Sequence, residues 1–181
     1  MQASLSISAA SAFRYGPAWC LAVLLVASPL ASYGANPDLG LTELPPVELG
    51  PAALRAGSVQ HGTLNTSQIQ QQGTRSSAFV GQRGSHNSAV ISQTGSGNQA
   101  IANQTGTGNE ARITQAGSND LAIANQWGTD NLAVIEQYTR NARSTISQFG
   151  TQNQAHVLQT TPGSSAPVLQ FGDRLKITVI R

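Results

Sequence analysis

From residue 60 to residue 170, Gln recurs at every eleventh position, and this spacing restricts the fold more than any other feature. The series has no break: Gln60, Gln71, Gln82, Gln93, Gln104, Gln115, Gln126, Gln137, Gln148, Gln159 and Gln170. Self-similarity at a fixed period indicates a repeat architecture, in which each unit stacks on its neighbours to bury what it cannot bury alone.

Other residue types keep step with the Gln. With the Gln as position zero, Gly recurs at position two, in Gly62, Gly73, Gly84, Gly95, Gly106, Gly117, Gly128 and Gly150. Asn recurs at position five, in Asn65, Asn87, Asn98, Asn109, Asn131 and Asn153. Position seven is Ala or Ser, and position nine is mostly Ile or Val. These positions define one unit of eleven residues.

An eleven-residue period suits either a right-handed helical supercoil or a β repeat. A Gly in nearly every unit costs a helix about 1 kcal/mol each, and no charged pairs compensate. Positions five, seven, nine and eleven instead alternate, as residues on one face of a strand do. Positions one to four, typically x-G-x-x with Ser, Thr or Gly, are typical of turns. We therefore predict an all-β fold, a β-solenoid of strand-turn-strand rungs with 22 residues per rung and two facing parallel sheets, as in cross-β amyloid.

The composition requires polar side chains inside this fold. Only 10% of the residues are charged and 5% are aromatic, while Gly, Asn, Gln, Ser and Thr are abundant, so we do not expect a conventional packed core. Stacking puts each residue over the one 22 places on, for example Gln93 over Gln115. A side-chain amide can donate to one rung and accept from another, so we expect the Gln and Asn to form ladders.

The N-terminal third has a different character. Residues 1–34 read as a signal peptide, with Arg14 before an apolar run and small residues before a cleavage point after Gly34 or Ala35. The lone Cys20 lies inside this segment, so the mature chain is expected without disulfides. Residues 35–59 contain four Pro and read as a flexible leader or export segment. Residues 60–181 form the repeat domain of eleven half-repeats, the last two degenerate.

The unit resembles the curlin repeat, Q-x-G-x-x-N-x-A-x-x-x-Q. QRGSHNSAVISQ at 82–93, QTGSGNQAIANQ at 93–104, QTGTGNEARITQ at 104–115 and QFGTQNQAHVLQ at 148–159 carry the pattern in full. The resemblance implies a structural subunit of curli, an extracellular amyloid fibre on the bacterial surface. It also implies that the chain is secreted through the curli export channel, with its accessory factors in the outer membrane, and polymerises with itself and with a major curlin subunit.

Two units depart from the pattern in ways similar to the minor curlin, which nucleates the fibre and anchors it to the cell. QYTRNARSTISQ at 137–148 replaces the Gly and Asn, and the tail QFGDRLKITVIR at 170–181 replaces the polar pattern by apolar residues. We predict the minor subunit, with the major fibre subunit as the alternative. The candidate anchoring and nucleating residues are Arg140, Arg143, Arg174, Lys176 and Arg181.

Other functions find less support. His61, His86 and His156 occupy different positions of their units and cannot form a metal ladder. The acids Glu110, Asp120, Asp130 and Glu136 are expected at turns or outward positions, where none is paired for acid-base work, so we predict no catalysis, metal or cofactor. A net charge of +2 with scattered basic residues argues against nucleic acid as a partner. A monomeric secreted β-solenoid, an adhesin or an ice-binding protein, is the alternative from another class, although no outward row of Thr is present.

Aromatic residues also recur in register. Trp127, Tyr138, Phe149 and Phe171 all follow the Gln directly, and Trp127 and Phe149 lie one rung apart. Packing at the edge of the turns is the simpler interpretation of these rings, and a binding platform is the other.

Overall fold

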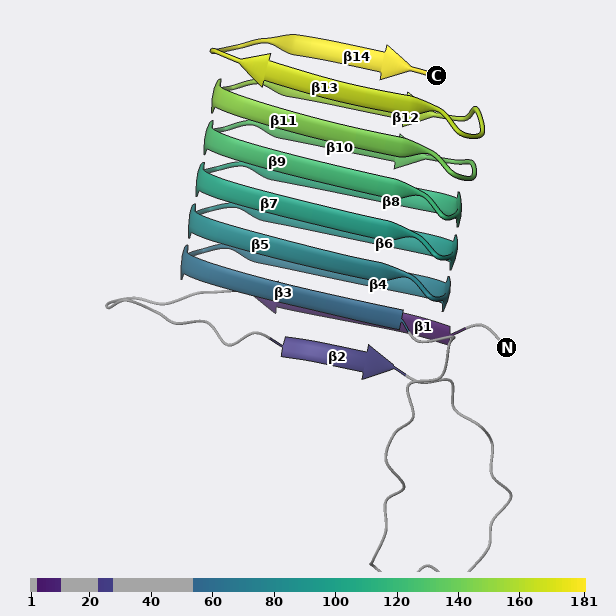
Figure 1. Ribbon diagram of the computed structural model, residues 1–181. Helices are drawn as coiled ribbons and strands as arrows, with labels where there is room; N and C mark the ends of the chain where they lie inside the picture. Colours follow the sequence, from purple (N-terminus) through teal and green to yellow (C-terminus); the bar gives the residue numbers. More distant parts are fainter. Residues whose placement is uncertain (1–2, 11–22, 28–53) are drawn as a thin grey trace, which may run out of the picture.

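The computed structural model describes residues 3–10, 23–27 and 54–181. Its main body is a stack of twelve strands that run back and forth through six rungs (Figure 1). These strands are β3 (Leu54–Thr63), β4 (Thr66–Thr74), β5 (Ser77–Ser85), β6 (Ser88–Ser96), β7 (Gln99–Thr107), β8 (Glu110–Ser118), β9 (Leu121–Thr129), β10 (Leu132–Gln137), β11 (Arg143–Thr151), β12 (Gln154–Gln159), β13 (Ser165–Phe171) and β14 (Lys176–Ile180).

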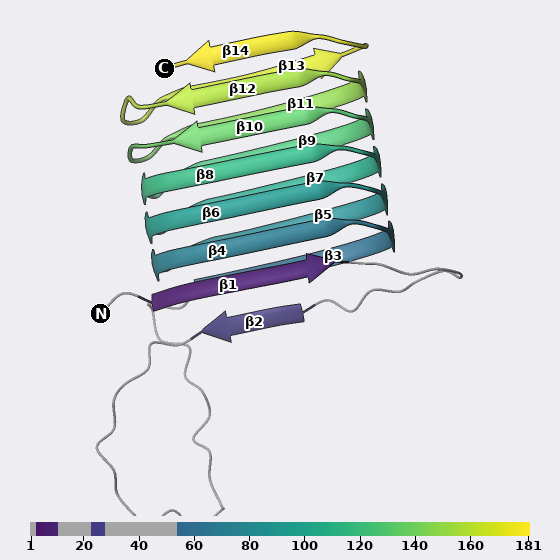
Figure 2. The same ribbon diagram turned by 180° about the vertical axis from the view of Figure 1, so that it is seen from behind.

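The strands alternate between two sheets. Sheet A contains β4, β6, β8, β10, β12 and β14, and sheet B contains β3, β5, β7, β9, β11 and β13. Within each sheet these strands are parallel, and the register places every residue beside the one 22 positions away, as in Gln93 beside Gln115. The turned view in Figure 2 shows sheet A in front. The predicted all-β solenoid with 22 residues per rung and two parallel sheets is thus confirmed.

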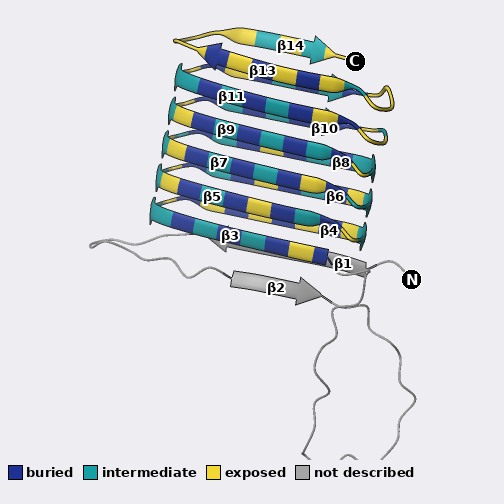
Figure 3. Cartoon of the chain, viewed as in Figure 1, coloured by how far each residue is buried: buried dark blue, intermediate teal, exposed yellow. Residues whose placement is uncertain are grey.

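Burial alternates along each strand, as Figure 3 shows, because successive side chains point to opposite faces. The buried row of sheet A consists of Ile69, Ile91, Ile113, Ile135 and Val157. Small Ala and Ser residues fill the neighbouring inward positions, and Ser58 and Ser67 touch across the two sheets with their Oγ atoms 2.6 Å apart. These small residues allow the sheets to approach closely, which gives a thin, continuous core.

The first rung begins earlier than the count from Gln60 suggests. Strand β3 starts at Leu54, so the last six residues of the predicted leader, 54–59, belong to the solenoid. Leu54, Ala56 and Ser58 point inward like the corresponding residues of later rungs, although no Gln precedes them at the expected spacing. The rest of the predicted leader, 35–53, lies outside the described residues.

Two further strands lie at the first rung. Strand β1 (Ala3–Ala10) pairs antiparallel with β4, and β2 (Val23–Ala27) pairs antiparallel with β3. Both fall within the predicted signal peptide, which stays a prediction. Cys20 and the expected cleavage point lie outside the described residues.

Candidate functional site

The Gln side chains form two continuous hydrogen-bonded columns. In sheet B, each Nε2 donates to the Oε1 of the Gln 22 residues on, from Gln60 through Gln82, Gln104, Gln126 and Gln148 to Gln170, at 2.6–2.9 Å. In sheet A the same bonds run from Gln71 through Gln93, Gln115 and Gln137 to Gln159 at 2.6–2.8 Å. All eleven amides are buried, and a buried amide is tolerated only when its hydrogen-bonding groups are satisfied.

The second amide hydrogen of most of these Gln ties the two sheets together. Gln82 in sheet B donates to the carbonyl of Thr66 in sheet A at 3.0 Å, and Gln93 in sheet A donates to the carbonyl of Ser77 in sheet B at 3.1 Å. The same bond recurs up the stack to Gln170. The Gln columns therefore fix the stacking of rungs and the spacing of the sheets at once.

Asn side chains form a third column at one side of the stack. Asn65, Asn87, Asn109, Asn131 and Asn153 lie where the chain turns from sheet B to sheet A, and we call this the Asn corner. Asn109 is representative: its Nδ2 donates to Asn87 Oδ1 at 3.1 Å and to the Gly128 carbonyl at 2.9 Å. Its Oδ1 accepts from the backbone and the side chain of Asn131. Every polar atom of that side chain is used.

The opposite corner lacks this regularity. Where the chain turns from sheet A to sheet B, the five equivalent positions hold Ser76, Asn98, Asp120, Ala142 and Ser164, and we call this the mixed corner. Asn98 lies here, between Ser76 and Asp120, and not on the column formed by the other five Asn. It keeps the donation to a carbonyl 19 residues on, Gly117, but makes no amide–amide bond.

Asp120 is the residue that sequence reasoning misplaced. We expected a turn or outward position for its carboxyl, yet its side chain is buried, with 1% of its surface exposed. Burial raises the pKa of Asp120 above its ordinary value of 3.8, and the N–H of Ala142 lowers that pKa by less. The signal was available, because Asp120 occupies position five, which holds Asn in most units.

The glycines at position two lie where successive rungs touch backbone to backbone. A Cβ on Gly106 would lie 1.9 Å from the carbonyl oxygen of Gly128, and its φ is +124°. Gly62, Gly73, Gly84, Gly95, Gly128 and Gly150 have the same positive φ, whereas Gly117, whose neighbour on the next rung is Thr139, does not. The residue at position four also has a positive φ in every unit, even where it is not Gly, as at Leu64 and Arg75. The sequence pattern did not reveal this left-handed conformation.

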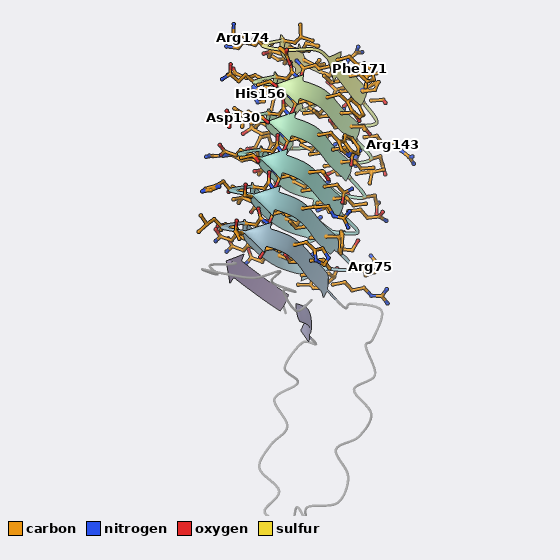
Figure 4. All side chains as sticks on the ribbon, turned by 90° about the vertical axis from the view of Figure 1, so that its left-hand side faces the viewer. Arg75, Asp130, Arg143, His156, Phe171 and Arg174 are labelled. Atoms are coloured by element: carbon orange, nitrogen blue, oxygen red, sulfur yellow. The ribbon has the colours of Figure 1, made fainter. Side chains whose placement is uncertain are left out.

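The end of the stack, from the turn after β10 onward, exposes basic and apolar side chains. Arg140, Arg143, Arg174, Lys176 and Arg181 are all exposed, and none forms an ion pair within residues 54–181. Ile177 and Val179 pack against the core, while Leu169, Phe171 and Ile180 are 60%, 64% and 70% exposed. Figure 4 shows that Arg143 lies on one side of the stack and Arg174 on the other, so the five cations do not form a single cluster.

Four aromatic residues directly follow a Gln, and the rings of three of them stack on one another. Trp127 and Phe149 have ring centroids 4.6 Å apart, and Phe149 and Phe171 have centroids 4.7 Å apart. Tyr138 belongs to sheet A's side of the chain and is 48% exposed. Because the rings lie face to face along the stack, they offer mainly their edges to solvent, which favours packing between rungs over a flat binding platform.

The charged side chains of sheet A's outer face pair locally. Arg112 Nε lies 2.6 Å from Glu110 Oε1, and His156 Nε2 lies 3.0 Å from Glu136 Oε2. In residues 3–10, 23–27 and 54–181, no three His, Cys, Asp or Glu side chains lie together as a metal site would need. Among the same residues, we find no helix with the length and apolarity to cross a membrane.

Comparison with protein families gives one match. The family model of the curlin associated repeat matches residues 73–106, 86–117, 106–138 and 117–150. Neither the curated proteins nor the solved structures contain a match. The matched stretches extend from β4 into β11, so they include the mixed corner at Asp120 and leave out the last rung.

Proposed function

Since the chain belongs to the curlin family, whose repeats support a role as a subunit of an extracellular curli fibre, we propose that it is the minor subunit. In this role it nucleates polymerisation of the major subunit and holds the fibre to the cell surface. The observation that carries the proposal is the contrast between the regular inner rungs and the last rung, which has exposed apolar and basic side chains on the same Gln-aligned backbone.

The end of the stack supports nucleation by templating. Strands β13 and β14 are the last members of their sheets, so one edge of each has no neighbour within the described chain. An incoming strand with the same spacing can pair with this edge and continue the Gln column from Gln170. The edge is already ordered, so it offsets part of the conformational entropy that a disordered chain loses when it docks.

The basic residues support anchoring. Arg140, Arg143, Arg174, Lys176 and Arg181 are exposed and carry no ion-pair partner in the described part of the chain. Each cation near an anionic lipid surface contributes about 1 kcal/mol of attraction. Three of them, Arg174, Lys176 and Arg181, fall after Gln170, where the stack ends. We propose that they contact phosphate groups of the outer surface.

Deletion of residues 160–181 tests the proposal. We expect cells that produce the truncated chain to shed their fibres into the medium, and the purified truncated chain to lose its ability to seed a major curlin. A matched variant, Arg174→Gln with Lys176→Gln and Arg181→Gln, keeps the strand pattern and should lose attachment while it still seeds. Normal attachment and seeding by the truncated chain would contradict the minor-subunit role.

The second candidate is the major fibre subunit. It is favoured by the units at 82–93, 93–104, 104–115 and 148–159, which carry the full repeat pattern. A major subunit should polymerise by itself after truncation and should build most of the fibre mass. A chain that remains monomeric at every concentration and never seeds would instead support a monomeric β-solenoid adhesin or ice-binding protein.

A further inference from the structure

Asp120 places a carboxyl group in the mixed corner, and only one of its two oxygens accepts a hydrogen bond. Its Oδ1 accepts from the backbone N–H of Ala142 at 2.8 Å, in the way that each Asn Oδ1 accepts from the rung above. Its Oδ2 is buried and has no hydrogen-bond partner. A buried oxygen of this kind is costly, because water no longer solvates it and nothing in the protein replaces that water.

The equivalent atom of Asn shows what Oδ2 faces. At Asn87, Asn109 and Asn131, the second side-chain atom is Nδ2, which donates to the carbonyl 19 residues on at 2.9–3.0 Å. At Asp120 the corresponding carbonyl is that of Thr139. A Cβ built on Gly117 would lie 1.5 Å from Thr139 O and 2.8 Å from Asp120 Oδ2, so both oxygens border the same point. An ionised carboxylate therefore opposes one acceptor with another.

We propose that Asp120 is a proton-operated lock between the rung of β9 and the rung of β11. When the carboxyl takes a proton from solvent, its Oδ2–H donates to the Thr139 carbonyl and replaces the bond that Asn makes elsewhere. When the proton leaves, the negative charge repels the carbonyl and the corner loosens. This lock adds a form of regulation to the proposed fibre role. It rests on that role only because fibre assembly requires these rungs to be folded.

No cation around the corner replaces the proton. On the rung above, Tyr138, Arg140 and Arg143 are exposed, and neither Arg forms an ion pair with Asp120. On the rung below, residues 94–99 contain no titratable side chain. Arg75 lies at the same corner two rungs below. Protonation is thus the means by which this site becomes neutral.

The direction of the pH effect follows from the raised pKa of Asp120. A carboxyl whose folded-state pKa lies above its unfolded value contributes its full stability below the unfolded pKa. That contribution is lost as the pH rises through the folded pKa. Acid therefore closes the lock, and between the two pKa values the folding equilibrium should fall about tenfold per pH unit.

Asp120→Asn tests the lock, because Asn restores a permanent Nδ2 donor toward Thr139. Asp130→Asn is the matched control: it removes the same charge from an exposed turn of the Asn corner. The purified chain and both variants are assembled over a series from pH 4 to pH 8, and the soluble protein left at equilibrium is measured after sedimentation. The carboxyl ¹³C shift of Asp120 in fibres reports its protonation directly.

As the pH rises from 4, we expect the soluble concentration of the wild type and of Asp130→Asn to increase by up to tenfold per pH unit. The soluble concentration of Asp120→Asn should be lower than that of the wild type and should change less with pH. Identical pH profiles for all three chains, or an ionised Asp120 in fibres formed in acid, would overturn the lock. If no chain forms fibres, the fibre role fails separately. The same profiles are then measured by denaturant unfolding of the monomer, with the same two outcomes.

Discussion

The two corners of the solenoid have the same backbone period but different side-chain chemistry. In the Asn corner, each of Asn87, Asn109 and Asn131 donates to the rung on both sides and accepts from the rung above. In the mixed corner, Asn98 makes no amide–amide bond, Asp120 leaves an oxygen unpaired and Ala142 offers no side-chain hydrogen bond. One side of the molecule is thus a continuous column and the other is a series of separate contacts.

This difference shows that the period and the stability of a rung are separate properties. The Gln columns run unbroken on both sheets, so the register is maintained past Ala142. What the mixed corner loses is local hydrogen bonding, at the point where the turn after β10 is irregular and Thr139 replaces Gly. We infer that a curlin rung tolerates substitution at one corner when the Gln columns and the other corner remain intact.

The largest effect is expected from Gly106→Ala in the Asn corner. The new Cβ would lie 1.9 Å from Gly128 O at a φ of +124°, so the rungs must separate. We expect a loss of more than about 3 kcal/mol of stability against denaturant. In Gly163→Ala, at the mixed corner, the Cβ meets nothing within 4 Å and only the φ of +70° is strained, which costs about 1–2 kcal/mol. Equal losses would contradict the close approach of the rungs.

The next largest effect is expected at the Asn residues, where the two corners can be compared directly. Asn109→Ala removes the partners of the Gly128 carbonyl and the Asn131 N–H together with two amide–amide bonds, and we expect a loss of about 2–3 kcal/mol. Asn98→Ala removes the equivalent carbonyl and N–H partners without any amide–amide bond. Its loss, measured by the same denaturant titration, should be smaller by about 1 kcal/mol. A larger loss at Asn98 would reverse the order of the two corners.

A smaller, stabilising effect is expected from Ala142→Asn. The new Nδ2 can donate to Asp120 Oδ1, which now accepts only the Ala142 N–H. We expect a gain of about 0.5–1.5 kcal/mol in the free energy of unfolding. Ala155→Asn is the control, because it buries the same amide between the sheets instead of at a corner and should destabilise the chain. A loss at Ala142 similar to that at Ala155 would show that the corner cannot accept the amide.

The smallest effect is expected beside the Asn corner, where the aromatic rings stack. Phe149→Leu removes the contacts at 4.6 Å and 4.7 Å with Trp127 and Phe171. Because Trp127 and Phe171 are exposed, we expect a loss of only about 0.5 kcal/mol. Tyr138→Leu, beside the mixed corner, removes a ring that stacks on no other within the described residues and should change stability less. Thermal unfolding of the two variants decides whether the stack contributes.

Most of the fold followed from the sequence because period and alternation are local properties. The spacing of Gln93, Gln104 and Gln115, with small and β-branched residues between them, was sufficient to predict the rung and its two sheets. The beginning of the first rung at Leu54 did not follow, because the count depended on Gln and that half-rung has the inward residues without a Gln at its start.

The candidate site was predictable where it repeats and hidden where it does not. The Gln and Asn positions were identified by recurrence, and the structure divides the Asn between two corners according to which units share a side of the stack. The sequence predicts a turn or outward position for Asp120 because acidic side chains are usually solvated. Its burial results from the corner itself, where the rungs above and below cover position five.

The sequence by itself determined the period, the strand faces and the family, because eleven-residue recurrence records which side chains must lie over one another. Only the tertiary structure decided which of those side chains are satisfied. A hydrogen bond between rungs depends on the atoms that both rungs present, and Asp120 brings a buried Oδ2 without a partner to a position where an Asn would bring a donor.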